Sequence, residues 1–165
     1  MNANLENIRL ANWADLELML AWRGSTIAMR NAITEDFLNL PLRICQIFLA
    51  FNKEGVLIGT VQLKHKHSDP DFCDEKSAYV QALEVRHDYF RRGVASNIMN
   101  FLVQHANQNG IERLTLMVET DNAPAFALYQ KLGFRSFKTA SWVWDGKEFP
   151  TICLEKHLTK NMDDS

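Results

Sequence analysis

The sequence predicts an α/β protein in which a mixed central sheet is flanked by helices. Strand-like and helix-like segments alternate along the chain, turn residues separate them, and the composition, 47% apolar and 23% charged, is that of a folded protein. No internal repeat, low-complexity tract or linker-like stretch interrupts the 165 residues. We therefore expect a single domain over residues 1–165, with a core over about 6–158 and a frayed tail at 159–165.

The amino-terminal half is expected to contain a short strand, helices and a hairpin. Residues 7–11 suit a strand, residues 16–23 place apolar side chains at helical spacing, and residues 25–45 are predicted to be mostly helical. Two apolar runs, 46–51 and 56–64, follow with a polar turn between them, which predicts an antiparallel pair of strands.

Strands and helices alternate in the next part of the chain. Residues 77–85 and 113–119 are strand-like, and the apolar residues from Val94 onward recur on one helical face. Gly110 suits the left-handed position that ends this helix. This part of the chain therefore contributes two strands and a helix to the predicted mixed sheet.

A helix and a hairpin complete the predicted order of elements. Asp121 or Asn122 can cap a helix that has Pro124 in its first turn, and Gly133 can end it. Residues 141–158 contain two strand-like runs about an Asp145-Gly146 turn, which predicts a closing hairpin.

Charge and cysteine content exclude several classes of protein. The net charge of −2 and the pI of about 6.2 give no overall attraction to nucleic acid or to an anionic membrane. No apolar run approaches the roughly 20 residues of a spanning helix, and the first ten residues lack the features of a signal peptide. Three widely spaced cysteines argue against a disulfide framework. We expect a cytoplasmic protein that binds neither nucleic acid nor membrane.

The stretch YFRRGVAS, residues 89–96, lies where a strand pattern gives way to a helix pattern. The first N–H groups of a helix have no internal partner and carry partial positive charge, so phosphates bind there. A glycine and a small residue leave the backbone accessible, and two arginines add cationic donors. The stretch predicts a pyrophosphate cradle, the alternative being a plain turn with two surface arginines. The residues of this cradle are Arg91, Arg92, Gly93, Val94, Ala95 and Ser96.

This stretch and a second one about 30 residues later resemble the GNAT superfamily of acyl-CoA-dependent N-acetyltransferases. The family's first signature is Gln/Arg-x-x-Gly-x-Gly/Ala after a strand, and here LEVRHDYFRRGVAS, residues 83–96, corresponds to it. The second is Asn-x-x-Ala-x-x-Leu-Tyr-x-Lys-x-Gly-Phe, which NAPAFALYQKLGF, residues 122–134, matches. The resemblance covers about residues 6–158 and implies a GNAT-type fold, with two splayed parallel strands in the central sheet.

The resemblance implies acetyl-CoA as the acyl donor and no metal. In the family the pantetheine arm of the donor lies where the two parallel strands part. Backbone groups of Leu83 and Val85 would pair with that arm as a further strand does. Asn122 would line the cleft beside the donor, and Ala125 lies on the helix face that the donor would contact.

Tyr129 is implied to face the thioester sulfur as the catalytic acid. Attack by an amine releases a thiolate whose free pKa is about 8.5, and a phenol with a pKa near 10 can hydrogen-bond or protonate it. The alternative is that Tyr129 is an amphipathic core residue that closes the helix.

The chain departs from the family pattern at two positions. Phe90 stands where the first signature has Gln or Arg, and Gln81 stands where many relatives carry a glutamate base in mid-strand. Deprotonating a lysine-like amine at pH 7 costs roughly 4.6 kcal/mol, against about 1 kcal/mol for an α-amino group. Glu84 is the nearest candidate base and Glu119 the second, either acting through water; the alternative for Glu84 is a solvent-facing charge at a strand end.

Two further features are open to more than one interpretation. The loop at residues 65–75 holds two histidines and Cys73 at a spacing that matches no zinc pattern, and four carboxylates that are typical of a solvated turn. If this loop borders the acceptor entrance, it would favour a cationic acceptor. Trp142 and Trp144 share one face of the hairpin and suit the core or a subunit contact, with an acceptor pocket as the alternative.

The sequence thus predicts an N-acetyltransferase, monomeric or homodimeric, in which a primary amine of a small molecule or peptide attacks acetyl-CoA directly in a ternary complex. Two other classes remain open. One is a CoA-binding sensor or interaction domain that has lost the chemistry, and the other is a binder of a different phosphate ligand such as ATP or a dinucleotide.

Overall fold

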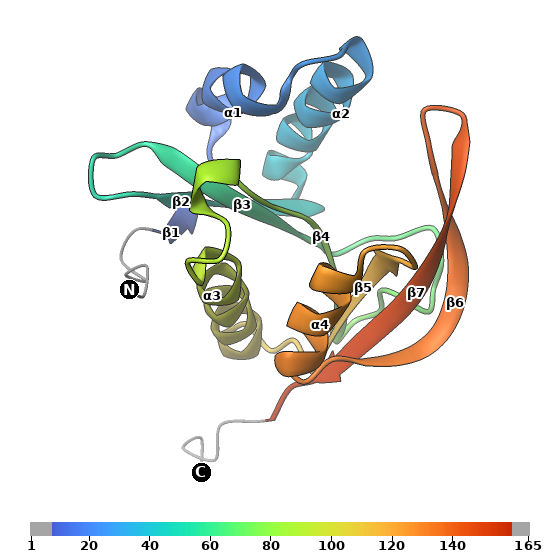
Figure 1. The fold of residues 1–165 in the computed structure, drawn as a ribbon. Helices are drawn as coiled ribbons and strands as arrows, with labels where there is room; N and C mark the ends of the chain where they lie inside the picture. The colour runs from blue at the N-terminus through green and yellow to red at the C-terminus, as the bar shows by residue number, and fades with distance from the viewer. Residues whose placement is uncertain (1–7, 160–165) are drawn as a thin grey trace.

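The fold is that of a computed structural model, which describes residues 8–159. Within these residues seven strands form one sheet in the order β1-β2-β3-β4-β5-β7-β6. Helices α1 and α2 cover one face of the sheet, and α3 and α4 cover the other (Figure 1). The neighbouring strands are antiparallel except β4 and β5, which are parallel. The predicted mixed α/β sheet with flanking helices is confirmed.

The strands are β1 (Ile8–Leu10), β2 (Cys45–Phe51), β3 (Leu57–Lys64), β4 (Ser77–Val85), β5 (Arg113–Glu119), β6 (Arg135–Trp144) and β7 (Lys147–His157). The helices are α1 (Leu16–Arg23), α2 (Ile27–Leu38), α3 (Val94–Gln108) and α4 (Ala123–Lys131). Short 3₁₀ turns lie at Trp13–Asp15, Leu40–Leu42 and His87–Tyr89.

The start of β6 was predicted wrongly. The strand begins at Arg135 rather than at residue 141, and Arg135 pairs with Glu155 of β7. β6 lies at the edge of the sheet and is largely exposed, so its first half lacks the apolar run that marks a buried strand. The predicted turn is confirmed, because Asp145 and Gly146 have φ angles of 49° and 75°, as a tight hairpin turn requires.

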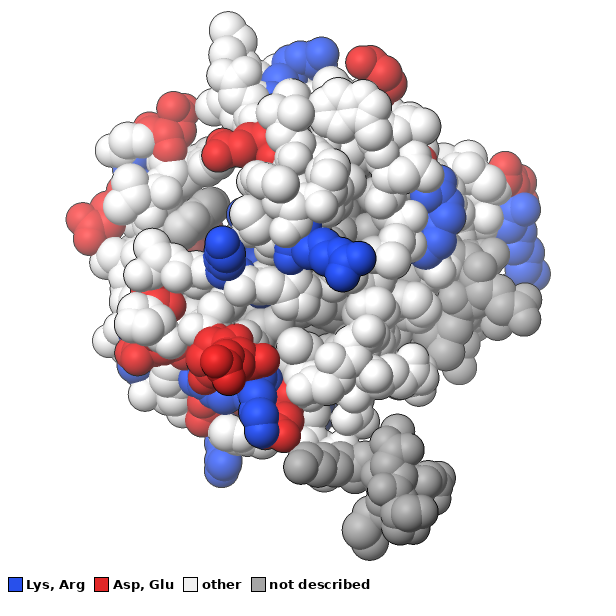
Figure 2. Space-filling view, turned by 180° about the vertical axis from the view of Figure 1, so that it is seen from behind, with Lys and Arg blue, Asp and Glu red and all other residues white. Residues whose placement is uncertain are grey.

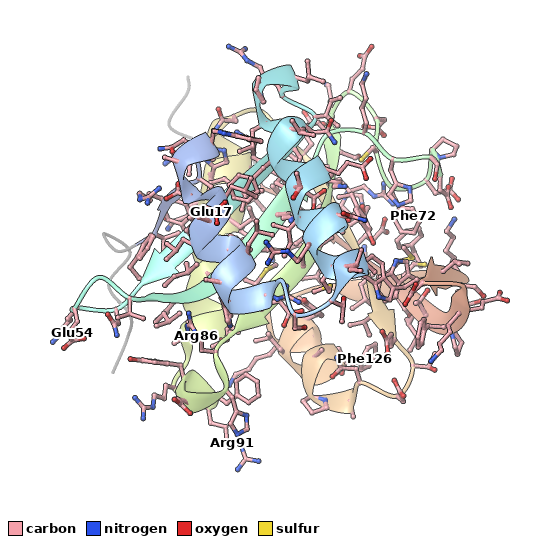
Figure 3. The ribbon with its side chains drawn as sticks, turned by 90° about the horizontal axis from the view of Figure 1, so that it is seen from above. Glu17, Glu54, Phe72, Arg86, Arg91 and Phe126 are labelled. Atoms are coloured by element: carbon pink, nitrogen blue, oxygen red, sulfur yellow. The ribbon has the colours of Figure 1, made fainter. Side chains whose placement is uncertain are left out.

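The sheet is buried on both faces. Along β2, Ile47 and Leu49 belong to the apolar cluster under α1 and α2, whereas Phe48 and Ala50 belong to the cluster under α3 and α4. Successive side chains of a strand point to opposite faces, so one run of consecutive apolar residues serves both clusters. Figure 3 looks onto α1 and α2, which lie side by side across the sheet.

Strands β4 and β5 separate part of the way along their length. They pair only from Ser77 with Arg113 to Val80 with Leu116, although β4 continues to Val85 and β5 to Glu119. At this point the register of β4 against β3 shifts, and Ala82 has a φ of 54°. A bulge bends its strand and increases the local twist, so it turns β4 away from β5. The predicted splay of the two parallel strands is therefore present.

The surface has no dominant charge on the face that Figure 2 shows, where acidic and basic side chains are intermixed. Among residues 8–159, no helix combines the length and the apolar character needed to cross a bilayer. Residues 6–7 of the predicted core and 160–165 of the predicted tail lie outside the described residues, and the single domain stays a prediction.

Gly59 of β3 lies where α3 packs against the sheet, and it provides a test of that packing. A Cβ there would lie 2.6 Å from Ile98 Cδ1 and 3.3 Å from the carbonyl oxygen of Glu84. We expect Gly59→Ala to lower the free energy of unfolding by about 1–3 kcal/mol in urea denaturation, because overpacking displaces neighbouring atoms. Ile98→Val removes the Cδ1 atom. The loss of unfolding free energy in the variant that carries both changes should therefore be smaller than the sum of the two single losses. Additive losses would contradict the contact.

Candidate active site

The separation of β4 from β5 opens into a cleft of about 1170 Å³. Its walls come from the end of β4, the start of α3, the end of β5, the start of α4 and the hairpin strand β6, with α1 and α2 closing one side. Ligands of open α/β sheets bind at the carboxyl ends of parallel strands. The volume exceeds the roughly 300–1,000 Å³ of small-ligand pockets, so the cleft has room for a ligand larger than a typical small molecule.

One end of the cleft is formed by the amino terminus of α3. Gly93 precedes the helix with a φ of 76°, and among the described residues no side chain caps its first N–H groups. A Cβ on Gly93 would meet nothing within 4 Å, so the glycine is required by its backbone angle while the space above it stays open. Arg91 has a φ of 62° and projects outward from this loop (Figure 3). The open, uncapped helix start fits a pyrophosphate.

The six predicted cradle residues do not all face the cleft. Five of them line it, but Arg92 does not, and its guanidinium lies 5.1 Å from the centre of the Tyr89 ring. Val94 is buried in the core, so its backbone is the part that a ligand can contact. Phe90, in place of the family's Gln or Arg, lines the cleft and is 54% exposed.

The long walls of the cleft carry the predicted strand and helix residues. Leu83 and Val85 lie beyond the last parallel pair, so the edge of β4 that faces β5 is open there. Asn122 and Ala125 line the opposite wall, and Asn122 Oδ1 accepts a hydrogen bond from the Ala125 N–H at 3.3 Å. This bond caps α4 and fixes the position of the helix start beside the cleft.

Tyr129 lines the cleft while its side chain is almost fully buried. Burial, and after it the negative charge of Glu84, raises the pKa of Tyr129 to about 12. The phenol is therefore neutral at physiological pH and can donate a hydrogen bond. Because a phenol with this pKa is a weaker acid than a thiol, it is suited to donating a hydrogen bond to a thiolate rather than to protonating it fully.

The carboxylate of Glu84 is ion-paired and half-exposed. Its Oε1 lies 3.1 Å from Nη2 of Arg23, which α1 brings to the cleft. Glu119, the second candidate base, lines the cleft at the end of β5. The structure thus places both carboxylates at the cleft, and that of Glu84 already has a cationic partner in Arg23.

Several polar residues of the cleft were not predicted from the sequence. Arg23, Asp36, Gln62 and Lys64 come from α1, α2 and β3, far from either motif. One signal was visible, because Gln62 interrupts the otherwise apolar run 56–64, and a polar residue in a buried strand has a structural or functional reason.

The acidic loop lies away from the cleft. None of its four carboxylates lines the cleft, and Lys138 of β6 holds Asp69 at 2.6 Å and Asp71 at 2.9 Å. His67 packs against the rings of Phe72 and Tyr79. Within residues 8–159, no three His, Cys, Asp or Glu side chains form a group that could hold a metal ion.

The tryptophans of the β6–β7 hairpin line the cleft. The sequence favoured a position in the core or at a subunit contact, with a place in a pocket as the alternative. Trp142 and Trp144 stack with their ring centres 6.0 Å apart, and Trp142 is 39% exposed. They present an aromatic surface at the side of the cleft opposite the α3 cradle.

Comparisons with known proteins agree with this geometry. The model of the acetyltransferase (GNAT) family matches residues 10–134. The chain is 36% identical over 93 residues to a mycothiol acetyltransferase of Saccharomonospora viridis, covering 56% of the chain and 30% of that protein. It is 35% identical over 98 residues to the N-alpha-acetyltransferase MAK3 of Arabidopsis thaliana, covering 59% of the chain and 48% of that protein. The chain thus spans less than half the length of these two relatives.

The fold also matches solved structures. That of Arabidopsis thaliana NAA60 in complex with acetyl-CoA superposes with a TM-score of 0.73 at 22% identity, covering 92% of this chain and 97% of that one. At this identity the match establishes the fold.

The raised pKa of Tyr129 can be measured directly. The phenol should ionise with a midpoint near pH 12, so the 295 nm absorbance difference between the wild type and Tyr129→Phe should rise there. Since unfolded tyrosine ionises near pH 10, the stability contributed by this neutral phenol is complete below pH 10 and is lost as the pH rises to about 12.

Glu84→Gln should lower that midpoint, because it removes the neighbouring negative charge. A difference signal with a midpoint near pH 10 would show that Tyr129 is solvated.

Proposed function

The chain belongs to the acetyltransferase (GNAT) family, and we propose that it transfers an acetyl group from acetyl-CoA to the amino group of an acceptor. The observation that carries the proposal is the open edge of β4 beside the uncapped amino terminus of α3. A backbone edge and an anion site in one cleft suit a ligand that has an amide-bearing arm and a pyrophosphate, as acetyl-CoA has.

The donor would be held by backbone groups at both ends of its arm. Leu83 and Val85 offer strand-like N–H and C=O groups to the pantetheine amides, and Gly93 to Ser96 offer N–H groups to the pyrophosphate. Arg91 adds a cationic donor at the rim, while Arg92 supports the loop through its contact with Tyr89. The absence of a Gln or Arg at Phe90 leaves the phosphate contacts to the backbone and Arg91.

The acetyl thioester supplies the electrophilic carbon. The nitrogen of a neutral amine forms a bond to this carbon, the carbon–sulfur bond breaks, and the amine proton passes to solvent through water near Glu84 or Glu119. Tyr129 donates a hydrogen bond to the departing sulfur from a position fixed by its burial on α4. The size of the cleft supports direct attack in a ternary complex, in which both substrates are bound at once.

We propose an α-amino group as the acceptor. Gln81 in mid-strand is no base, so the site suits an amine that is partly neutral on its own at pH 7, as an α-amino group with a pKa near 7.8 is. One of the relatives is named an N-alpha-acetyltransferase. The two stacked tryptophans offer an apolar surface to the part of the acceptor that follows its amino group. The cytoplasmic location and the monomeric or dimeric state stay predictions.

The direct test is a thiol-release screen with acetyl-CoA and a panel of amines. We expect turnover with peptides and small molecules that carry a free α-amino group, and at least tenfold lower kcat/KM at pH 7 with alkyl amines of similar size. Tight acetyl-CoA binding without thiol release from any amine would identify a CoA-binding sensor instead. A larger rise in melting temperature with ATP or a dinucleotide than with CoA would identify a different phosphate ligand.

Tyr129→Phe tests the role of the phenol. It removes the hydrogen-bond donor and keeps the ring, so kcat should fall by about 10²–10³ while the dissociation constant of acetyl-CoA stays unchanged. Phe134→Leu, which alters the ring that packs edge-on against Tyr129, is a matched control for packing and should have a much smaller effect on kcat. Undiminished turnover in Tyr129→Phe would remove Tyr129 from the mechanism.

A further inference from the structure

A chain of three polar side chains runs from α2 to the point where β4 leaves β5. Gln62 Nε2 donates a hydrogen bond to Asp36 Oδ2 at 3.0 Å, and Gln81 Nε2 donates to Gln62 Oε1 at 2.7 Å. All three residues line the cleft, and Gln62, at the centre, is only 5% exposed. These two hydrogen bonds thus connect the carboxylate of Asp36 on α2 with the amide of Gln81, which stands in place of the family's glutamate.

The carboxylate decides which way both amides point. An ionised carboxylate only accepts hydrogen bonds, so Gln62 must turn its NH₂ group toward Asp36 and its Oε1 toward Gln81. Gln81 must then turn its own NH₂ group toward Gln62. The remaining polar atom of Gln81 is the carbonyl oxygen Oε1, which is used by no hydrogen bond among the described residues.

Two neighbouring side chains support this direction. Lys64 Nζ lies 3.3 Å from Asp36 Oδ1, which keeps positive charge beside the carboxylate. The Cys45 thiol donates a second, longer hydrogen bond to Gln62 Oε1 at 3.8 Å. Burial raises the pKa of the Cys45 thiol to about 12, so it stays protonated and remains a donor. Both donors that reach Gln62 Oε1 therefore require the same orientation of its amide.

We propose that Asp36 is a positioning residue that fixes the Gln81 amide, and that Gln81 Oε1 accepts a hydrogen bond from an N–H of the attacking amine. This inference rests on the proposed acetyltransferase function and specifies how the same site orients its acceptor. With one N–H held by a neutral oxygen, the amine directs its lone pair away from Gln81. A neutral oxygen attracts an ammonium ion less than a glutamate does, so the site selects amines that arrive deprotonated.

The test is a double-mutant cycle that reverses the direction of the two hydrogen bonds between Gln81, Gln62 and Asp36. Gln81→Glu places a carboxylate against Gln62 Oε1, and Gln62 cannot donate to carboxylates at both of its ends because both of its N–H groups are on one nitrogen. Asp36→Asn removes the acceptor-only group at the other end. In the double variant, an asparagine at position 36 can donate to Gln62 Oε1 and Gln62 Nε2 to a glutamate at position 81. Both hydrogen bonds between these three side chains are then restored in the opposite sense, and only the longer bond from the Cys45 thiol is lost.

We expect Gln81→Glu to lower kcat/KM for the acceptor about tenfold, and Asp36→Asn to raise the acceptor KM about fivefold without changing the dissociation constant of acetyl-CoA. The kcat/KM of the double variant should be at least fivefold higher than the value obtained by multiplying the two single effects on kcat/KM. Glu54→Gln, the same carboxylate-to-amide change in the exposed turn between β2 and β3 (Figure 3), is the control and should leave the kinetics unchanged. Single effects that simply multiply, or a Gln81→Glu variant as active as the wild type, would overturn the proposal.

A second measurement needs neither turnover nor a variant that folds. In the wild type the side-chain NH₂ groups of Gln62 and Gln81 should exchange with solvent at least tenfold more slowly than those of exposed glutamines such as Gln130. Fast exchange at Gln81 would overturn the fixed orientation, whatever the activity. Slow exchange in a protein that releases no thiol would refute the proposed function and leave the orientation of the amide standing.

Discussion

Every part of the proposed site depends on the parting of β4 and β5 after four paired residues. A sheet normally pairs each interior strand along its length, because an unsatisfied buried N–H or C=O group costs about 1–3 kcal/mol. Here the bulge at Ala82 turns β4 away, and both strands keep a partner on their outer edges, β4 with β3 as far as Val85 and β5 with β7 as far as Glu119. The facing edges open onto a cleft, where solvent or a ligand can satisfy their polar groups.

Three kinds of group meet in this opening. The amino terminus of α3 offers a site for an anion, the end of β4 offers a backbone edge for an extended arm, and the far side offers stacked aromatic rings. Tyr129 lines the same cleft, and its burial keeps the phenol neutral. One bend in one strand thus opens the cleft in which the proposed donor and the proposed acceptor would lie beside Tyr129.

The sequence predicted the parts of the site that two local motifs encode. Gly93 and Asn122 fix helix starts, and such signals act within a few residues, so they are readable without the fold. The splay itself followed from the family resemblance. The sequence did not reveal Arg23 and Asp36, because nothing in α1 or α2 indicates which of their side chains face strands that come much later in the chain. Nor did it reveal the early start of β6, since an exposed edge strand needs no apolar pattern. Tertiary packing of distant elements forms the side of the cleft proposed for the acceptor, whereas local motifs form the side proposed for the donor.

The most direct measurement of the central claim is backbone hydrogen exchange with and without acetyl-CoA. If the opening between β4 and β5 holds the donor, the amides of residues 83–85 and 94–96 should gain protection together at saturating acetyl-CoA, while amides of the β6–β7 hairpin turn at 145–146 stay unchanged. Protection that appears elsewhere, or at the α3 start without the end of β4, would contradict the claim that the donor lies in this opening.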